Sequence, residues 1–350
     1  MIEEWLWDSY IDNDMNTIEK LLQNEDLDLN WINPKTKSSI LYMACEDQRI
    51  DIVKQFLDKP NIDVNLSCKG KTPLCISSER GFLDIIQELL NHPQIDVNLS
   101  TQYGETPLFL AGESGHLEVI KVLIETPNVR KNSASTDGRS PFYVACEEGH
   151  FDVIQELLKY PEININQFNS ERFSPLHVAC QNGHLEIVKE LLKKSKLVLN
   201  QWNLQGETPL LLACNQGHSD IVRVLLSDSR VEVNHVSNEG KTSLIVACLN
   251  GKLSIVKWIL SCEKEIDMDL KWKGRNAKVL AKMKGYIQIS DLLCAYESNR
   301  LDTIYKLQRE SQILGITFDD YLFYLVDFIL LLFIISFFFK KTFFFFSNYQ

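Results

Sequence analysis

The feature that most constrains this chain is a segment that returns at a fixed interval. A triplet of the type Thr/Ser-Pro-Leu begins at Thr72, Thr106, Ser140, Ser174, Thr208 and Thr242, each 34 residues after the one before. Self-similarity with a period of about 20–50 residues marks repeat architectures, in which each unit is one supersecondary element. The chain, at 350 residues, also exceeds the roughly 250–300 residues that one hydrophobic core supports. The sequence therefore predicts a stack of similar units.

The local chemistry of one unit predicts two short helices. Thr72 suits the N-cap of a helix, and Pro73 suits its first position, where a missing N–H costs nothing. Gly81 suits the end of that helix, where a left-handed residue is favoured. Apolar residues then recur at helical spacing, at Leu83, Ile86, Leu89 and Leu90. Because such a helix pair cannot bury its apolar face alone, neighbouring pairs must stack.

Two further markers keep the same register. A glycine, in most copies followed by histidine, recurs from Gly81 to Gly251, and a triplet ending in Val/Ile-Asn recurs from Asp63 onward. Together with the Thr-Pro-Leu triplet and an Ile-Val-x-x-Leu-Leu helix, these markers resemble the ankyrin repeat over about residues 4–293. The resemblance implies an all-α ankyrin-repeat solenoid of stacked helix–turn–helix units, used as a protein-binding scaffold.

The repeat register divides the chain into six segments. We expect an N-terminal capping repeat at 1–38, seven ankyrin repeats at 39–275, a C-terminal capping repeat at 276–293, a polar helical linker at 294–320, a candidate transmembrane helix at 321–339 and a short tail at 340–350. Only one copy keeps the histidine that the family usually has after the triplet, at His177. We therefore expect uneven stability along the stack.

The residues that resemble metal or catalytic groups have structural explanations. Cys146, Cys180, Cys214 and Cys248 share one repeat position. Stacked helices lie roughly 8–10 Å apart, whereas a disulfide needs Cα atoms within about 7 Å. The row of histidines lacks metal-ligand spacing, and no phosphate loop, dinucleotide motif or nucleophile elbow occurs in the sequence. We predict that the protein is not an enzyme and uses no catalytic residue, metal or cofactor.

Charge and cysteine usage bear on partners and compartment. The net charge is −11, from 36 basic and 47 acidic residues, so the basic surplus typical of nucleic-acid binders is missing and no nucleic-acid partner is expected.

The nine cysteines are odd in number and form no Cys-x-x-Cys pair, and the first residues do not resemble a signal peptide. Free thiols in the reducing cytoplasm are predicted. Asn65 and Asn98 begin Asn-x-Ser sequons, which the repeat itself explains.

The candidate site is a surface. In a stack of this kind, the loop tips and the outer ends of the first helices line one concave face. The residues predicted to bind a partner there are Tyr103, Glu105, Glu113, Arg139, Glu147, Glu148, Phe173, Gln181, Asn182, Trp202 and Asn215. The middle of this face is acidic and carries aromatic side chains, a composition that interface centres favour. Two interpretations stay open: a solvated charged rim, or a groove for a protein or peptide that is basic or bears aromatic residues.

The composition changes in the C-terminal tail. Fifteen of the nineteen residues from Tyr321 to Phe339 are Leu, Ile, Phe or Val. At about 1.5 Å per residue, a helix of this length spans roughly 28 Å, close to a bilayer core of about 30 Å. Asp327 costs about 2.5–3.5 kcal/mol on an insertion scale, which fifteen apolar residues at about 0.3–0.6 kcal/mol each outweigh. Membrane insertion through 321–339 is therefore favoured.

Three alternatives remain for this segment. The first is a tail anchor that holds the ankyrin stack on the cytoplasmic side of a membrane, as a membrane-tethered scaffold or as a targeting or regulatory adaptor in signalling. The second is a buried or oligomerising apolar helix in a soluble cytoplasmic protein. The third is that the Phe-rich run after Phe337 reflects T-rich and A-rich DNA and is not a selected protein sequence.

Overall fold

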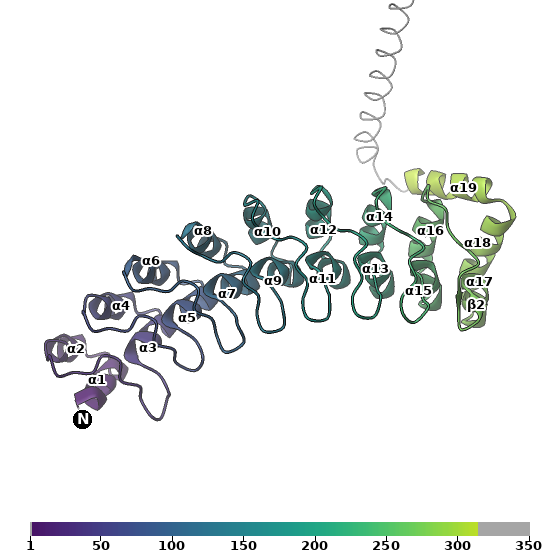
Figure 1. Ribbon diagram of the computed structural model, residues 1–350. Coiled ribbons are helices and arrows are strands. Elements are labelled where there is room, and N and C mark those ends of the chain that lie inside the picture. The colour runs from purple at the N-terminus through teal and green to yellow at the C-terminus, as the bar shows by residue number, and fades with distance from the viewer. Residues whose placement is uncertain (1, 314–350) are drawn as a thin grey trace, which may run out of the picture.

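The computed structural model describes residues 2–313 as a row of antiparallel helix pairs (Figure 1). The pairs are α1 (Ile2–Ile11) with α2 (Met15–Leu21), α3 (Ile40–Glu46) with α4 (Ile50–Leu57), α5 (Pro73–Arg80) with α6 (Leu83–Asn91), α7 (Pro107–Ser114) with α8 (Leu117–Glu125), α9 (Pro141–Glu148) with α10 (Phe151–Leu157), α11 (Pro175–Asn182) with α12 (Leu185–Leu192), α13 (Pro209–Gln216) with α14 (Ser219–Ser227), α15 (Ser243–Leu249) with α16 (Leu253–Ser261), and α17 (Ala277–Met283) with α18 (Ile287–Ser298). The predicted all-α stack is confirmed.

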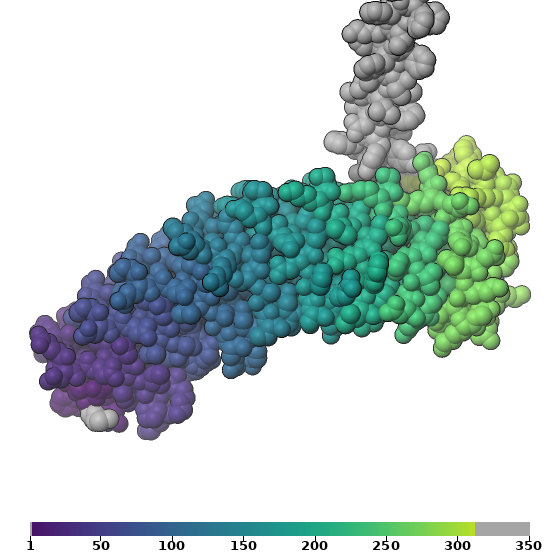
Figure 2. Space-filling model, viewed as in Figure 1, coloured from purple at the N-terminus to yellow at the C-terminus, as the bar shows by residue number. Residues whose placement is uncertain are grey.

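The row of helix pairs bends gently along its length. The second helices, α2 to α16, lie along the outer side of the bend, and the loops between repeats hang below the first helices on the inner side (Figure 1). The repeats pack without gaps into one continuous body (Figure 2). The predicted apolar helix at 321–339 lies outside the described residues. From residue 2 to residue 313, no helix has the length and apolar character needed to cross a bilayer.

The first helix of each repeat begins and ends as its sequence predicts. The hydroxyl of Thr72 accepts a hydrogen bond from the Cys75 amide at 3.1 Å, and Pro73 follows at the first helical position. Gly81 ends α5 in the left-handed conformation, with a φ of 77°. In α3, which has neither Pro nor Gly at these positions, Ser39 still caps the start and Gln48 takes the left-handed φ of 58°.

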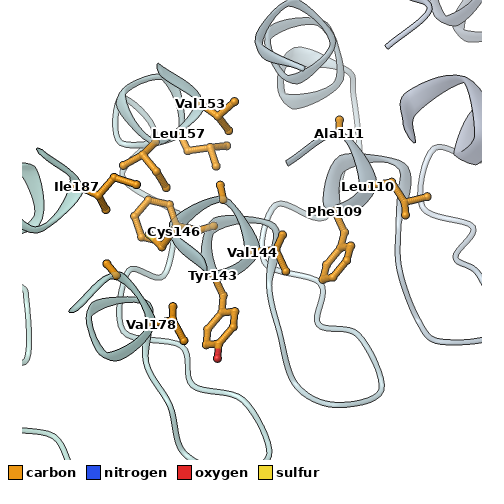
Figure 3. Packing of buried hydrophobic residues seen from close by; sticks show 14 of the residues in the cluster. Phe109, Leu110, Ala111, Tyr143, Val144, Cys146, Val153, Leu157, Val178 and Ile187 are labelled. Carbon is orange, nitrogen blue, oxygen red and sulfur yellow. The ribbon is translucent and has the colours of Figure 1, made fainter. Parts of the chain in front are cut away.

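Apolar side chains fill the layers between helices. In α6 the buried residues are Ile85, Ile86 and Leu89, whereas Leu83 and Leu90 are only partly buried at the edges of the apolar face. Figure 3 shows one such layer in the middle of the stack, between the repeats of α7, α9 and α11. The repeated cysteines are free and belong to this core. Burial raises the pKa of the Cys248 thiol to about 12, which makes it a poor nucleophile at neutral pH.

Histidines that follow four of the helix-ending glycines join their repeats to the preceding ones. The Nε2 atoms of His116, His150 and His184 donate to the carbonyl oxygens of Glu79, Glu113 and Glu147, at 2.9, 2.9 and 2.8 Å. Each ring lies directly against a glycine of the preceding repeat. A Cβ atom at Gly115 would come within 2.5 Å of the His150 ring, so this position requires glycine for space as well as for its φ of +76°.

The loop asparagines form a second ladder between repeats. Asn65 donates from Nδ2 to the Gln94 carbonyl at 2.7 Å and accepts from the Asp96 amide at 2.9 Å. Asn98 does the same with Asn128 and Arg130, at 3.0 and 2.8 Å. Both sequon asparagines are thus engaged in holding neighbouring loops together.

The C-terminal end differs in detail from the expected polar helix. Helix α18 continues to Ser298, and α19 (Arg300–Ile313) starts after a break at Asn299, whose φ is −151° and whose side chain accepts from the Asp302 amide at 3.3 Å. Helix α19 packs on α16 and α18. Leu307 of α19 is buried, whereas Leu301 is 80% exposed. The predicted limits of the individual domains stay predictions.

A short antiparallel hairpin also precedes α17. Strands β1 (Lys271–Trp272) and β2 (Arg275–Asn276) pair with Trp272 opposite Arg275. These strands could not be predicted from the sequence, because two-residue strands carry no alternating pattern. Similar chain reversals occupy the other loops between repeats, and these reversals form the candidate site.

Candidate functional site on the concave face

Five loop tips lie side by side along the inner side of the stack. They comprise residues 101–105 (tip 1), 135–139 (tip 2), 169–173 (tip 3), 203–207 (tip 4) and 237–241 (tip 5). Backbone hydrogen bonds join each tip to the next, from Thr136 to Tyr103 (2.7 Å), Ser170 to Asp137 (2.7 Å), Leu204 to Glu171 (3.0 Å) and Asn238 to Gln205 (3.0 Å). The tips therefore form one braced row, which presents its side chains with little freedom to rearrange.

Arg139 gathers three acidic side chains beside tip 2, of which Glu113 and Glu147 were predicted. Its guanidinium lies 2.7 Å from the Asp137 carboxylate, 3.2 Å from that of Glu147 and 3.8 Å from that of Glu113. The same group lies over the Phe109 ring, 5.6 Å from its centroid. The structure thus brings together Glu113, Arg139 and Glu147, which come from two first helices and the loop between them.

Negative charge exceeds positive charge at this place. Burial raises the pKa of the Glu113 carboxyl, and the charges of Glu105 and Glu148 raise it further, against the opposing effect of Arg139. Burial also raises the pKa of Glu147, with Arg139 opposing and Glu148 adding to the shift. One arginine therefore does not neutralise the carboxylates around it, and an added cation would stabilise their ionised forms.

The predicted amide residues lie at the ends of the first helices and brace them. Asn182 donates from Nδ2 to the Glu147 carbonyl at 2.8 Å, and Asn215 accepts through Oδ1 from the Asn250 side chain at 3.1 Å. The Gln181 carbonyl accepts from the His218 ring at 3.0 Å. Asn182 and Asn215 both keep exposed surface, and Asn182 borders the acidic cluster through its contact with Glu147.

The predicted aromatic residues do not form one cluster. Tyr103, which is 58% exposed, lies in tip 1, whereas Trp202, which is 48% exposed, lies just before tip 4. Three repeats at about 8–10 Å each separate them by roughly 25–30 Å. Phe173 is partly buried and meets the His177 ring edge-on at 5.8 Å. The predicted site is therefore an elongated surface, with its acidic part near tip 2.

Several surface residues near Trp202 were not among the predicted site residues. Arg172 in tip 3 lies between the rings of Phe168 and Trp202, and Trp202 stacks on His235. Leu204 in tip 4 is 55% exposed. One signal was available in the sequence, because Arg172 stands where the other four tips have glycine.

His177 fixes tip 4 to helix α11. Its Nδ1 accepts from the Ser174 amide at 3.1 Å, and its Nε2 donates to the Glu207 carbonyl at 3.1 Å. Burial lowers the pKa of this imidazole to about 4, so the ring is neutral at physiological pH. At the same position in the preceding repeat, Tyr143 accepts instead from Asn169 at 3.2 Å.

A family model described as ankyrin repeats (3 copies) matches this architecture in sequence. Its matches cover residues 7–101, 41–135, 81–169, 108–202 and 176–272, which together span most of the chain. The chain is an ankyrin repeat protein. Ankyrin repeat proteins are usually non-enzymatic modules for protein–protein interaction.

A solved structure supports the fold of this ankyrin repeat protein. The ankyrin repeat domain of Bcl-3, described as a unique member of the IkappaB protein family, matches with a TM-score of 0.56 and 24% identity. The match covers 63% of this chain and 98% of the Bcl-3 chain, and at this identity it shows the fold alone. No curated protein matches the chain.

Proposed function

We propose that this ankyrin repeat protein is a scaffold that binds a basic segment of a partner protein along its concave face. The observation that carries the proposal is the acidic cluster around Arg139, where burial and the charges of neighbouring carboxylates such as Glu148 raise the pKa of both Glu113 and Glu147. A lysine or arginine placed there would relieve repulsion that the free protein contains.

The braced row of tips supports the same proposal. Binding costs less when the surface is already ordered, because fewer side chains and loops lose freedom on association. The tip-to-tip hydrogen bonds supply this order on both sides of the acidic cluster, and the amide contacts at the helix ends add to it on the C-terminal side. An extended basic segment that follows the row would meet carboxylates from successive repeats.

Glu148 offers a clean test of the proposal. It is exposed, and within residues 2–313 it forms no ion pair, whereas Glu147 is already paired with Arg139. The full-length protein should select peptides rich in lysine and arginine from a random peptide library, and Glu148→Lys should lose this preference. For one selected peptide, Glu148→Lys should slow association, and the effect should shrink as salt rises.

Glu19→Lys is the matched control, because it reverses an exposed carboxylate on α2, on the outer side of the stack. This variant should select peptides as the unmodified protein does. If the unmodified protein shows no preference for basic peptides, the concave face does not bind a basic segment and the proposal is wrong.

We also propose that the segment 321–339 holds the scaffold at the cytoplasmic side of a membrane. The support is the run of apolar residues from Tyr321 to Phe339, which is long enough for a bilayer core. In that arrangement the scaffold would act as an adaptor that recruits its partner to the membrane.

A further inference from the structure

Arg172 has a backbone conformation that its residue type disfavours. Its φ is +64°, in the left-handed region. The corresponding residues of the other four tips are Gly104, Gly138, Gly206 and Gly240, with φ values from 75° to 87°. Glycine adopts this conformation without the clash that a Cβ atom causes. Strained residues of this kind cluster at functional sites, which indicates a functional role for the side chain of Arg172.

The side chain of Arg172 is part of a stack of planar groups, which we call the π-ladder: Phe168, Arg172, Trp202 and His235. The guanidinium carbon lies 5.6 Å from the Phe168 centroid and 5.9 Å from that of Trp202. The Trp202 ring stacks on His235, with centroids 5.8 Å apart and planes at 22°. The His235 ring is fixed in turn by donation to the Gly206 carbonyl at 2.9 Å. Three successive repeats therefore hold the ladder in place.

Exposed apolar side chains surround the π-ladder. Phe168, Trp202, Leu204 and Val236 are 47%, 48%, 55% and 43% exposed. All four lie in tip 4 or next to tips 3 to 5, which backbone hydrogen bonds join. Apolar groups gathered on one exposed surface mark interaction sites more often than scattered single residues do.

The charge of Arg172 sets it apart from the other cations of the tips. Arg139 in tip 2 pairs with Asp137 at 2.7 Å, and Lys241 in tip 5 pairs with Glu239 at 2.6 Å. The exposed guanidinium of Arg172 contacts rings only: over residues 2–313, no carboxylate forms an ion pair with it. Its planar edge thus keeps N–H donors in the geometry that binds a carboxylate through two parallel hydrogen bonds.

We infer that the π-ladder, with Leu204 and Val236, binds a peptide segment in which one carboxylate lies between large apolar side chains. The carboxylate pairs with the edge of Arg172, and the apolar side chains cover Trp202 and its neighbours, as in interfaces where arginine and tryptophan anchor binding. The inference rests on the proposed function of protein recognition. It adds a second contact, which prefers a negatively charged group, whereas the acidic cluster near tip 2 prefers cations.

The test uses the full-length protein and the same random peptide library. We expect a second class of selected peptides, in which Asp or Glu is flanked by Leu, Ile, Phe or Trp. Arg172→Gly should lose this class and keep the basic one, whereas Glu148→Lys should do the reverse. Glycine fits the tip, so Arg172→Gly should melt at the same temperature as the unmodified protein or higher, which separates lost binding from lost folding.

One selected peptide then allows a double-mutant cycle. Replacing its acidic residue by the amide should weaken binding to the unmodified protein at least tenfold, and should have little effect on Arg172→Gly. Arg172→Lys should recover less than half of the lost binding free energy, because an ammonium cannot supply the planar fork.

The possible outcomes distinguish this inference from the proposed function. Selection of acidic-apolar peptides without basic ones would support the π-ladder and refute the basic-segment proposal. The π-ladder inference is wrong if no acidic-apolar class appears, if Arg172→Gly keeps it, or if the phosphoserine form of a selected peptide binds tenfold better than the carboxylate form. It is also wrong if sedimentation shows a dimer that Trp202→Ala dissolves, because a second copy would then be the occupant.

Discussion

Protonation of His177 should destabilise the stack on its own. The ring is buried, its Nδ1 accepts from the Ser174 amide, and its Nε2 donates to the Glu207 carbonyl. A proton on Nδ1 would face the N–H of the Ser174 amide, which is also a donor, inside the buried core. Burial accordingly lowers the pKa of His177 from its ordinary 6.5 to about 4.

The direction of the effect on stability follows from this shift. The folded protein binds the proton less tightly than the unfolded chain, so folding stability is fully present above pH 6.5 and is lost as the pH falls toward 4. At about 1.36 kcal/mol per pKa unit, the total loss is about 3 kcal/mol. About 2 kcal/mol of it should be gone at pH 5.

The measurement is urea unfolding of the protein at pH 7.5 and at pH 5, compared with His177→Leu. Leu211 occupies the same repeat position in the next unit, so a leucine side chain fits there. The variant loses two hydrogen bonds and should be less stable at pH 7.5, but its loss of stability on acidification should be smaller by about 2 kcal/mol.

Leu211→Ala serves as the control, because it weakens the neighbouring core without removing a titratable group. Its stability should fall between pH 7.5 and pH 5 by the same amount as that of the unmodified protein. Equal pH dependence in the unmodified protein and His177→Leu would refute the argument that burial keeps this ring neutral.

Three further predictions concern packing and the tail. Gly115→Ala and Gly285→Ala both place a Cβ at a left-handed φ, but only the Cβ at position 115 meets a histidine ring. Thermal unfolding should therefore show that Gly115→Ala loses more folding stability than Gly285→Ala, by about 1 kcal/mol or more. Leu176→Ala should cost about 2–5 kcal/mol, and hydrogen exchange should show opening confined to neighbouring repeats; uniform loss of protection would contradict this. Full-length protein should resist carbonate extraction from membranes while a 1–315 truncation is released, and release of both would remove the anchor proposal.

The sequence by itself determined the units of this fold. The capping threonines and serines and the helix-ending glycines act within one turn of helix, and they recur every 34 residues. They could therefore be recognised without knowledge of any distant contact. The apolar spacing of α6 likewise predicted part of its buried face: Ile86 and Leu89 are buried as expected, Leu83 and Leu90 lie at its edges, and the buried Ile85 was not predicted. The concave face could be predicted as a surface for the same reason, since identical units expose equivalent positions.

The tertiary structure alone decided what that surface contains. Glu113, Arg139 and Glu147 meet only because adjacent repeats stack. The raised pKa values of the two glutamates arise from burial and from the charge of Glu148, against the opposing effect of Arg139. The distance between Arg172 and Trp202 was likewise invisible in the sequence, although the missing glycine was plain. Side chains 30 or more residues apart interact according to the distance and tilt between neighbouring layers. That geometry is set by packing over the whole interface between repeats, and no local pattern encodes it.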